Sequence, residues 1–429
     1  MNIVNRLESE VRSYCREWPA DFARAQGCRL TDTSGRSYLD LFAGAGALNY
    51  GHNHPVLKSA LLEYLAADGI VHSLDMATEA KERFLETFER LVLVPRGLDY
   101  KVQFPGPTGT NSVEAALKLV RKVSGRDRIV SFTNSFHGMT LGSLSVTGNS
   151  VKRGGAGLPL GSTVSMPFDG YMGEDVDTLD VFEAMLEDGG SGLDRPAGVI
   201  VETLQAEGGI NVASAGWLRR LAALCQRSEM LLIVDDIQVG NGRTGPYFSF
   251  EKAGITPDIV CLSKSLSGYG LPLAVTLIRP DIDLWAPGEH NGTFRGHNPA
   301  FVTAATALET FWTTGELTKE VNRKAARMEA ALDHLVEVYP ELGGQARGRG
   351  MLQGIACTPP DLGSKVTRAA FERGVIIETS GVESQTIKLL PPLVISDGEL
   401  EEGLAVLDLA IADALDVAPR SALEELAAV

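Results

Sequence analysis

Two charged residues follow short apolar runs whose composition predicts buried strands. Asp235 directly follows one such run, and Lys264 comes two residues after the next. A carboxylate and an amine at the ends of neighbouring buried strands would be partly desolvated, which strengthens their interactions. Lysine is scarce here, because Lys252 and Lys264 are the only lysines between Lys152 and Lys319. A cap or turn aspartate and a solvated lysine remain the alternatives.

A glycine-rich stretch, FPGPTGTN, runs from Phe104 to Asn111 and leads into a predicted helix at Ser112 to Val123. Consecutive backbone N–H groups at a helix N-terminus suit a phosphate. The alternative is a Gly/Pro turn in which Thr110 or Asn111 caps the helix. The stretch lacks the G-K-[ST] sequence of a Walker loop, which excludes that kind of nucleotide site.

Phe136 and His137 follow another predicted strand, Arg128 to Thr133. The aromatic ring could stack on a flat ligand at the same edge of the sheet, although a core phenylalanine is an equal alternative. His52 and His54 form an H-x-H pair, but no third ligand stands at a supportive spacing. We therefore expect no metal site.

A phosphate cradle, an aromatic platform, a carboxylate and a lysine together match the requirements of pyridoxal 5'-phosphate (PLP). The Lys264 amine would bond to the cofactor aldehyde, which requires a partly desolvated, neutral amine. The Asp235 carboxylate would keep the pyridine nitrogen protonated, so that the ring can accept electrons. The combination predicts a PLP enzyme.

The elements that must position these residues alternate between β-rich and helical runs from about residue 100 to 280. This alternation predicts an α/β fold with a mostly parallel central sheet covered by helices on both faces. The expected strands are Arg128–Thr133, Gly198–Glu202, Met230–Asp235, Asp258–Leu262 and Ala274–Ile278, and the expected crossover helices are Ser112–Val123 and Ala215–Cys225.

The pattern changes beyond residue 315. A long helix is expected at Glu316 to Val338 and a closing helix from Asp397, with β-rich runs between them near Met351–Ile355, Val375–Ile377 and Ile387–Leu389. We expect a large PLP-binding domain at 56–314 and a smaller α+β domain at 315–429. Residues 1–55 are expected to pack with the small domain.

Composition limits the classes of partner. The 429 residues are 44% hydrophobic and 22% charged, as in ordinary globular proteins. A net charge of −16 repels polyanions and anionic lipid, so we expect no nucleic acid and no membrane partner. Charges near the N-terminus and the lack of a long apolar run argue against an export signal or a membrane span. Five cysteines without a C-x-x-C pair suggest free thiols and a cytoplasmic location.

Several stretches, in order and spacing, resemble the class III (ornithine/GABA-type) aminotransferases of PLP fold type I, over nearly the whole chain. They are GALNYGHNHP, PTGTNSVEAALKL, SFHGMT, IVETLQAEGG, LLIVDDIQVGNGRTG, PDIVCLSKSLSGYGLPLA, NGTFRGHNP and IKLLPPL. The stretches DGIVHSLDM, MPFDGYMGE, RGLDYKV and GVIIETSG look most like the diaminobutyrate-forming branch, which serves ectoine and some siderophore pathways.

The resemblance implies roles for individual residues. Lys264 would be the covalent lysine and the proton shuttle, and Asp235 the partner of the ring nitrogen. Thr293 would reach the phosphate of the neighbouring subunit, which implies an obligate homo-oligomer, either a dimer or a dimer of dimers. The implied cofactor-binding set is Gly109, Thr110, Asn111, Phe136, His137, Asp235, Gln238, Lys264 and Thr293.

Substrate recognition departs from the family pattern. Glu207 matches a mobile acid that covers and uncovers a basic residue. Met139 and Lys388 stand where relatives carry arginines that bind substrate carboxylates. Lysine offers a point charge instead of a bidentate fork. Arg295 is a candidate replacement clamp, and Asn49 is a further expected substrate residue.

The implied reaction is ping-pong transamination. L-Glutamate would leave its amine on the cofactor and depart as 2-oxoglutarate, and L-aspartate 4-semialdehyde would accept the amine to give L-2,4-diaminobutyrate. The alternatives are another class III ω-aminotransferase, acting on ornithine, acetylornithine, GABA or a polyamine, a PLP-dependent mutase, racemase or decarboxylase, or a cofactor-free binding protein on the same scaffold.

Overall fold

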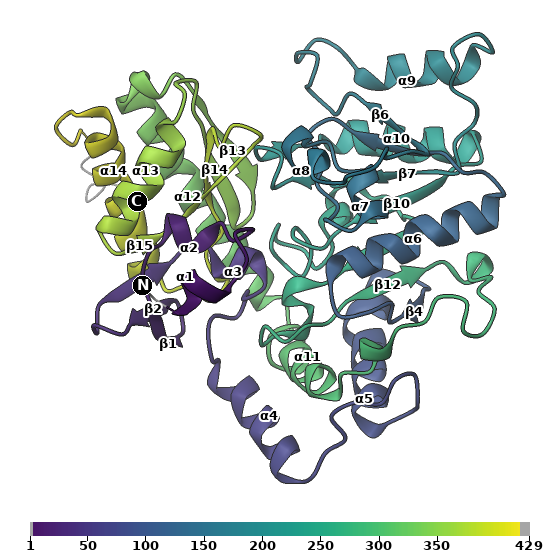
Figure 1. Ribbon diagram of the computed structural model, residues 1–429, viewed down its shortest axis with the longest axis horizontal. Helices are drawn as coiled ribbons and strands as arrows, with labels where there is room; N and C mark the ends of the chain where they lie inside the picture. The colour runs from purple at the N-terminus through teal and green to yellow at the C-terminus, as the bar shows by residue number, and fades with distance from the viewer. Residues whose placement is uncertain (1–2, 421–429) are drawn as a thin grey trace.

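The computed structural model describes residues 3–420. The larger part of the chain, from α4 (Pro55–Ala66) to α11 (Asn298–Phe311), surrounds a central sheet. A smaller part combines the N-terminal elements with those from α12 (Glu316–Val338) to α14 (Asp397–Leu415), and the two parts lie side by side (Figure 1). The long helix and the closing helix predicted beyond residue 315 are confirmed.

The central sheet has seven strands among the described residues. In spatial order they are β4 (Lys101–Gln103), β12 (Val275–Ile278), β11 (Ile259–Leu262), β10 (Leu231–Asp235), β7 (Gly198–Val201), β5 (Ile129–Phe132) and β6 (Thr163–Met166). β12 runs antiparallel to both of its neighbours, and the pairings from β11 to β6 are parallel. The five predicted strands are confirmed, as is the mostly parallel α/β class, whereas β4 and β6 were not predicted.

Helices cover both faces of this sheet because successive strand residues point to opposite sides. α6 (Gly109–Ser124) and α10 (Ala215–Arg227) each bury an apolar stripe. One core joins α6 to Ile129, Ile200, Ile233, Ile259 and Cys261, and the core on the other face joins α10 to Val199, Val201, Leu232, Val234, Val260 and Leu262. Both predicted crossover helices are therefore present.

α6 begins three residues before its predicted start. Thr108 is its N-cap, and the Asn111 side chain accepts hydrogen bonds from the backbone N–H and the hydroxyl of Thr108, at 3.1 and 2.8 Å. The alternative in which Thr110 or Asn111 is the cap is therefore not realised, because Asn111 occupies the third helical position and closes a capping box.

The smaller part contains two sheets. One has the order β13 (Gln345–Arg349), β14 (Leu352–Ala356), β17 (Thr386–Leu389) and β16 (Glu378–Ser380); the other has the order β1 (Phe22–Gln26), β2 (Arg29–Asp32), β3 (Ser37–Asp40) and β15 (Val375–Ile376). β3 pairs in parallel with β15, so the N-terminal strands extend a sheet that includes a C-terminal strand. The domain boundaries at residues 55/56 and 314/315 stay a prediction.

The remaining helices and strands connect these elements. They are α1 (Ile3–Leu7), α2 (Tyr14–Glu17), α3 (Ala43–Gly46), α5 (Glu79–Phe88), η1 (Glu89–Leu93), η2 (Val94–Arg96), α7 (Leu141–Ser145), α8 (Ser150–Gly154), α9 (Thr178–Glu187), β8 (Leu204–Gln205), β9 (Asn211–Val212), η3 (Ser249–Ala253), η4 (Lys264–Ser267), η5 (Pro280–Ile282), η6 (Thr293–Arg295), η7 (Pro340–Leu342) and α13 (Leu362–Glu372). Within residues 3–420, none of the helices combines the length and apolarity needed to cross a bilayer.

A fully buried arginine joins the two parts of the chain. Arg243 lies beyond β10, and its guanidinium donates to the carbonyl of Met351 at 3.0 Å, to the carbonyl of Pro391 and to Asn49 Oδ1 at 2.5 Å. Burial lowers the pKa of Arg243 to about 9. Its planar fork serves acceptors from three separate segments, which a lysine could not do in the same geometry.

We predict that Arg243→Leu lowers the free energy of unfolding by about 3 kcal/mol or more, because buried acceptors lose their donors. Thermal and urea unfolding measure this change. Arg24→Leu, at an exposed position on β1, is the control and should leave the midpoint almost unchanged. Equal, small effects of the two substitutions would show that Arg243 does not join the parts.

Candidate active site

Asp235 and Lys264 emerge at the same edge of the central sheet. β10 and β11 are parallel, with Asp235 in register with Cys261, and Lys264 begins the short helix η4 just beyond β11. Both side chains line one cavity of about 170 Å³. Lys264 has a φ of +52°, in the left-handed region that is costly for a residue with a Cβ. The backbone thus holds this lysine in a strained conformation at the cavity.

Hydrogen bonds from two neighbouring residues hold the Asp235 carboxylate in one orientation. It is 4% exposed, and its Oδ2 accepts a hydrogen bond from Nδ1 of His137 at 2.7 Å. Its Oδ1 accepts the backbone N–H of Ile237 at 3.2 Å. His137 is buried as well, and its Nε2 has no hydrogen-bond partner among residues 3–420. Two donors fix the direction of the carboxylate and leave lone pairs for a cationic group in the cavity.

Desolvation changes the protonation of Lys264. Burial lowers the pKa of its amine to about 8, with Lys388 acting in the same direction, while Glu207 opposes the shift. A larger fraction of the amine is therefore neutral near physiological pH than in an exposed lysine. This is the state that a nucleophilic amine requires.

Two glutamates add acidic groups to the same cavity. Glu202 follows β7, and its Oε2 accepts the backbone N–H of Phe136 at 3.0 Å. Burial, reinforced by Asp235, raises the pKa of Glu202 well above its usual value. Burial also opposes ionisation of Glu207, but Lys388 and Lys264 outweigh it and lower the pKa of Glu207 to about 2. The surroundings of the cavity thus shift the pKa values of the two acids in opposite directions.

The N-terminus of α6 reaches the cavity through Gly109 and Thr110. A Cβ at Gly109 would lie 2.9 Å from Cδ1 of Ile237, and a Cβ at Gly138, which has a φ of +130°, would lie 2.6 Å from Oγ1 of Thr110. Glycine is required at both positions for this close approach. The first backbone N–H groups of a 16-residue helix form a suitable site for a phosphate.

Phe136 lines the cavity and its ring is half-buried. The Lys152 amine, from α8, lies 4.2 Å from the centre of this ring. Gln238 also lines the cavity, and its amide donates to the carbonyl of Ala45 at 2.8 Å and to Oε1 of Glu207 at 3.2 Å. A flat ligand would thus meet an aromatic face on one side and polar groups around its edge.

Most of the site residues expected from the sequence line this one cavity. They are Gly109, Thr110, Phe136, His137, Glu207, Asp235, Gln238 and Lys264. Asn111 does not line it, because its side chain caps α6. Lys388 lies behind Glu207, with its amine 2.8 Å from Glu207 Oε1. Asn49 is buried away from the cavity and donates to the carbonyl of Asn241 at 3.0 Å.

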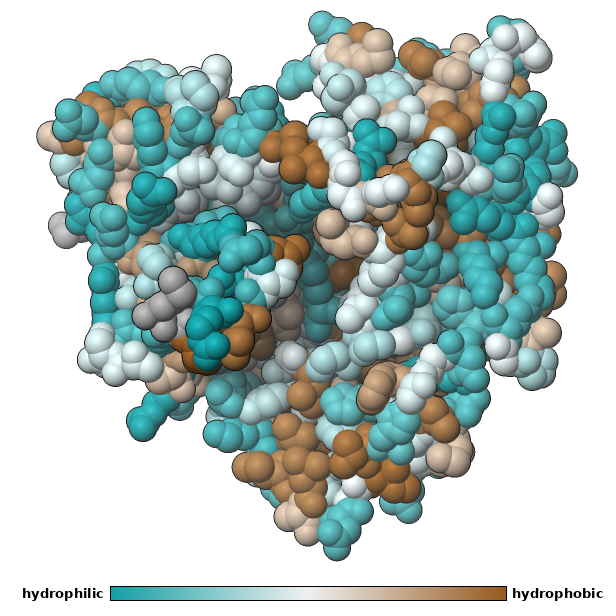
Figure 2. Space-filling model, viewed as in Figure 1, coloured by the Kyte–Doolittle hydropathy of each residue, from teal (hydrophilic) through white to brown (hydrophobic). Residues whose placement is uncertain are grey.

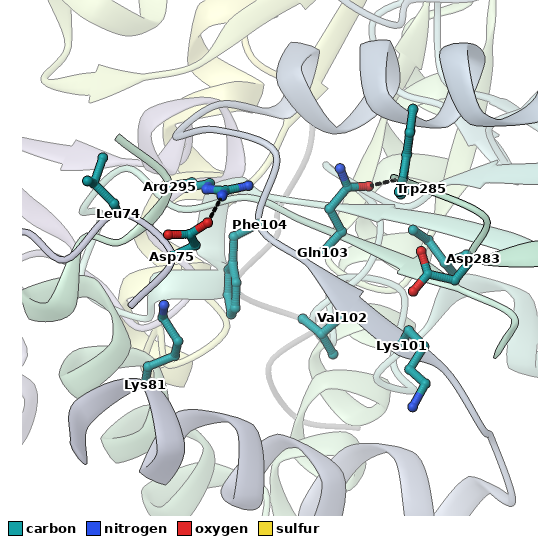
Figure 3. Close-up of a pocket in the computed structure, with 11 residues that line it drawn as sticks. Leu74, Asp75, Lys81, Lys101, Val102, Gln103, Phe104, Asp283, Trp285 and Arg295 are labelled. Carbon is teal, nitrogen blue, oxygen red and sulfur yellow. Dashed lines mark hydrogen bonds and ion pairs between the residues drawn. The ribbon is translucent and has the colours of Figure 1, made fainter. Parts of the chain in front are cut away.

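Arg295 lies at a different pocket, of about 350 Å³ (Figure 3). There it forms an ion pair with Asp75, beside Phe104 and Lys81 (Figure 3). Thr293, in the same short helix η6, is exposed and its carbonyl accepts a hydrogen bond from His72 at 2.5 Å. Neither residue reaches the Lys264 cavity of its own chain. The expected contact between Arg295 and a substrate carboxylate is therefore not formed within one chain, because Arg295 lies at the other pocket.

Five further lining residues were not singled out from the sequence: Gly138, Glu202, Leu204, Ile237 and Val239. Glu202 carried a usable signal, since it follows the buried run of β7 just as Asp235 ends that of β10. The apolar residues carried none, because their side chains have no chemical feature that separates a cavity wall from a core.

The surface is hollowed between the two parts of the chain (Figure 2).

Comparison with known proteins identifies the family. The model of the family described as aminotransferase class-III matches residues 13–411. The chain is 59% identical to a diaminobutyrate--2-oxoglutarate transaminase of Nocardia farcinica, covering 96% of this chain and 94% of the relative, and 58% identical to one of Halalkalibacterium halodurans, covering 95% of each. The chain belongs to the class-III aminotransferases.

Solved structures agree with this fold. An ornithine aminotransferase of Toxoplasma gondii superimposes with a TM-score of 0.82 at 25% identity, covering 96% of this chain and 94% of the other. A transaminase from the marine bacterium Virgibacillus gives a TM-score of 0.85 at 22% identity, covering 96% and 98%. The resemblance and the fold class expected from the sequence are thereby confirmed.

We predict that the Lys264 amine titrates near pH 8 in protein freed of small-molecule ligands. Because burial lowers the pKa, the amine is neutral above that pH, whereas exposed lysines stay charged to about pH 10.4. Reductive methylation with ¹³C-formaldehyde followed by an NMR titration measures this midpoint, and loss of the signal in Lys264→Arg assigns it. A midpoint in the range of the exposed lysines would contradict the desolvation.

Proposed function

We propose that this chain is a PLP-dependent transaminase that moves the amino group of L-glutamate to L-aspartate 4-semialdehyde, giving L-2,4-diaminobutyrate and 2-oxoglutarate. The single observation that carries the chemistry is the placement of Lys264 and Asp235 in one buried cavity. The substrates are supported by the relatives named diaminobutyrate--2-oxoglutarate transaminase, which are 54–60% identical over nearly the whole chain.

The cavity fits a flat heteroaromatic aldehyde that carries a phosphate. The N-terminus of α6 suits the phosphate, Phe136 provides a ring face, and the fixed carboxylate of Asp235 suits a protonated ring nitrogen. The aldehyde would meet the amine of Lys264. When bound, PLP supplies the electron-accepting ring that makes a C–H bond next to a substrate amine acidic.

Each of these residues would then have its own role in the reaction. Lys264, released from the cofactor, would take the proton at its Nζ and return it at a neighbouring carbon. Asp235 would hold a proton on the ring nitrogen, kept in place by His137. The backbone N–H groups of Gly109 and Thr110 would bind the phosphate, and Gln238 would approach the hydroxyl side of the ring.

The two substrates place different demands on the cavity. Glutamate reacts at its α-amine, so a carboxylate must bind close to the cofactor. The semialdehyde reacts at its aldehyde, so its amine and carboxylate lie farther away. Glu207 and Lys388 form a buried ion pair that could serve both cases, closed for the second substrate and opened for the first.

We also propose a homo-oligomer in the cytoplasm, with Thr293 reaching the site of a neighbouring subunit. The exposure of Thr293 and of Phe294, which is 67% exposed, supports a contact at this position. The five cysteines are unpaired thiols, which suits a reducing compartment. A large domain at 56–314 and a small domain at 315–429, joined by residues 1–55, complete the proposal.

The proposal predicts turnover with glutamate and aspartate 4-semialdehyde, and conversion of the bound cofactor to its amine form by glutamate alone. Lys264→Ala should lower kcat by about 10³-fold or more, because the proton shuttle is lost. Lys252→Ala, at an exposed lysine, is the matched control. Coupled assays and cofactor absorbance measure both effects.

Two results would contradict the proposal at different levels. Turnover with ornithine or GABA, but not with the semialdehyde, would assign a different ω-aminotransferase. Absence of conversion by glutamate alone would favour a mutase, racemase or decarboxylase, since these do not need a 2-oxoglutarate half-reaction.

A further inference from the structure

Lys388 lies between two carboxylates. Its amine is 2.8 Å from Oε1 of Glu207 and 2.8 Å from Oε1 of Glu378. Glu378 lies on β16, directly opposite Lys388 on the neighbouring strand β17. The Lys388 side chain is completely buried. Two acids therefore share one buried ammonium.

The two acids are not equivalent. Glu207 comes from the turn between β8 and β9, lines the cavity, and has a side chain that is 18% exposed. Glu378 belongs to a sheet, is 4% exposed at its side chain, and does not line the cavity. A ligand in the cavity would thus contact Glu207, whereas Glu378 forms an ion pair with Lys388 without lining the cavity.

A carboxylate in the cavity can reach Lys388 only if Glu207 moves, because no part of the lysine side chain is exposed. A buried ammonium that loses its single partner is strongly destabilised. Here the second partner remains. The Lys388 ammonium donates a hydrogen bond to Glu207 and forms an ion pair with Glu378. It can therefore keep this ion pair while another acceptor replaces Glu207.

Electrostatics permits this exchange. Burial raises the pKa of Glu378 to about 7, and Glu207 contributes to the increase while Lys388 opposes it. A substrate carboxylate that replaces Glu207 keeps one negative charge beside Lys388 and Glu378. The exchange therefore leaves the charge around the buried ammonium unchanged.

We propose that Glu378 is a positioning residue for the glutamate half-reaction: it holds Lys388 in place while Glu207 leaves and the substrate carboxylate takes its position. This inference rests on the proposed function. Glu378 itself touches neither substrate nor cofactor, and it acts only through Lys388. The diaminobutyrate half-reaction does not need Lys388 uncovered, so it should be insensitive to Glu378.

The test uses the PLP-loaded enzyme and separates the two substrates. Calorimetry measures binding of glutarate, a dicarboxylate without an amine or an oxo group, and cofactor absorbance measures single half-reactions with glutamate and with diaminobutyrate. The variants are Glu378→Leu and Glu378→Gln. Glu383→Leu, at an exposed glutamate in the turn between β16 and β17, is the control.

We expect Glu378→Leu to weaken glutarate binding and to raise the glutamate concentration for half-maximal rate by about tenfold or more. Its diaminobutyrate half-reaction should change by less than about twofold. Glu378→Gln keeps an oxygen at the same side-chain length but loses the charge, and should weaken glutarate binding less than Glu378→Leu does. If Glu378→Leu does not fold, Glu378→Met, with a side chain of similar length, carries the same expectation.

Unchanged glutarate binding in Glu378→Leu would overturn the inference, and so would equal losses for glutarate and diaminobutyrate, which would indicate a general packing defect. The proposed function fails separately, if wild-type enzyme is not converted by diaminobutyrate. Glutarate binding still decides the role of Glu378 in that case.

Discussion

Loss of solvent at one edge of the central sheet is the constraint on which the site depends. β10 and β11 run in parallel, so Asp235 and the segment that begins at Lys264 emerge together. The burial that lowers the pKa of the Lys264 amine also strengthens the attraction of Asp235 for a cation. The amine of Lys264 and the carboxylate of Asp235 can act on the two ends of one ring because both lie in the same buried cavity.

Neighbouring residues stabilise the buried charged groups of this site. His137 satisfies the buried carboxylate of Asp235, and the backbone around Lys264 accepts a left-handed conformation. Farther from the cofactor position, the charge of Lys388 is balanced by one acid at the cavity and one inside the sheet. Buried charges of this kind persist only when each has a partner.

Local patterns were sufficient for five of the seven strands of the central sheet and for the residues that follow them, because an apolar run that ends in a charged residue is visible within about ten residues. Asp235 and Lys264 were identified in this way, and Phe136 was identified as an aromatic residue that follows another predicted strand. Tertiary contacts decided the rest. Arg295 pairs with Asp75, some 220 positions away in the chain. Asn49 is engaged by a buried arginine of the other part of the chain, and no local signal reveals either contact.

The protonation state of the cofactor ring nitrogen reports directly on the role of Asp235. We propose ¹⁵N NMR of the enzyme loaded with PLP labelled at this nitrogen, at neutral pH. We expect the chemical shift of a protonated ring in the wild-type enzyme, and a shift toward the unprotonated form in Asp235→Asn. An unprotonated ring in the wild-type enzyme, or the same shift in both proteins, would contradict the role of the buried carboxylate.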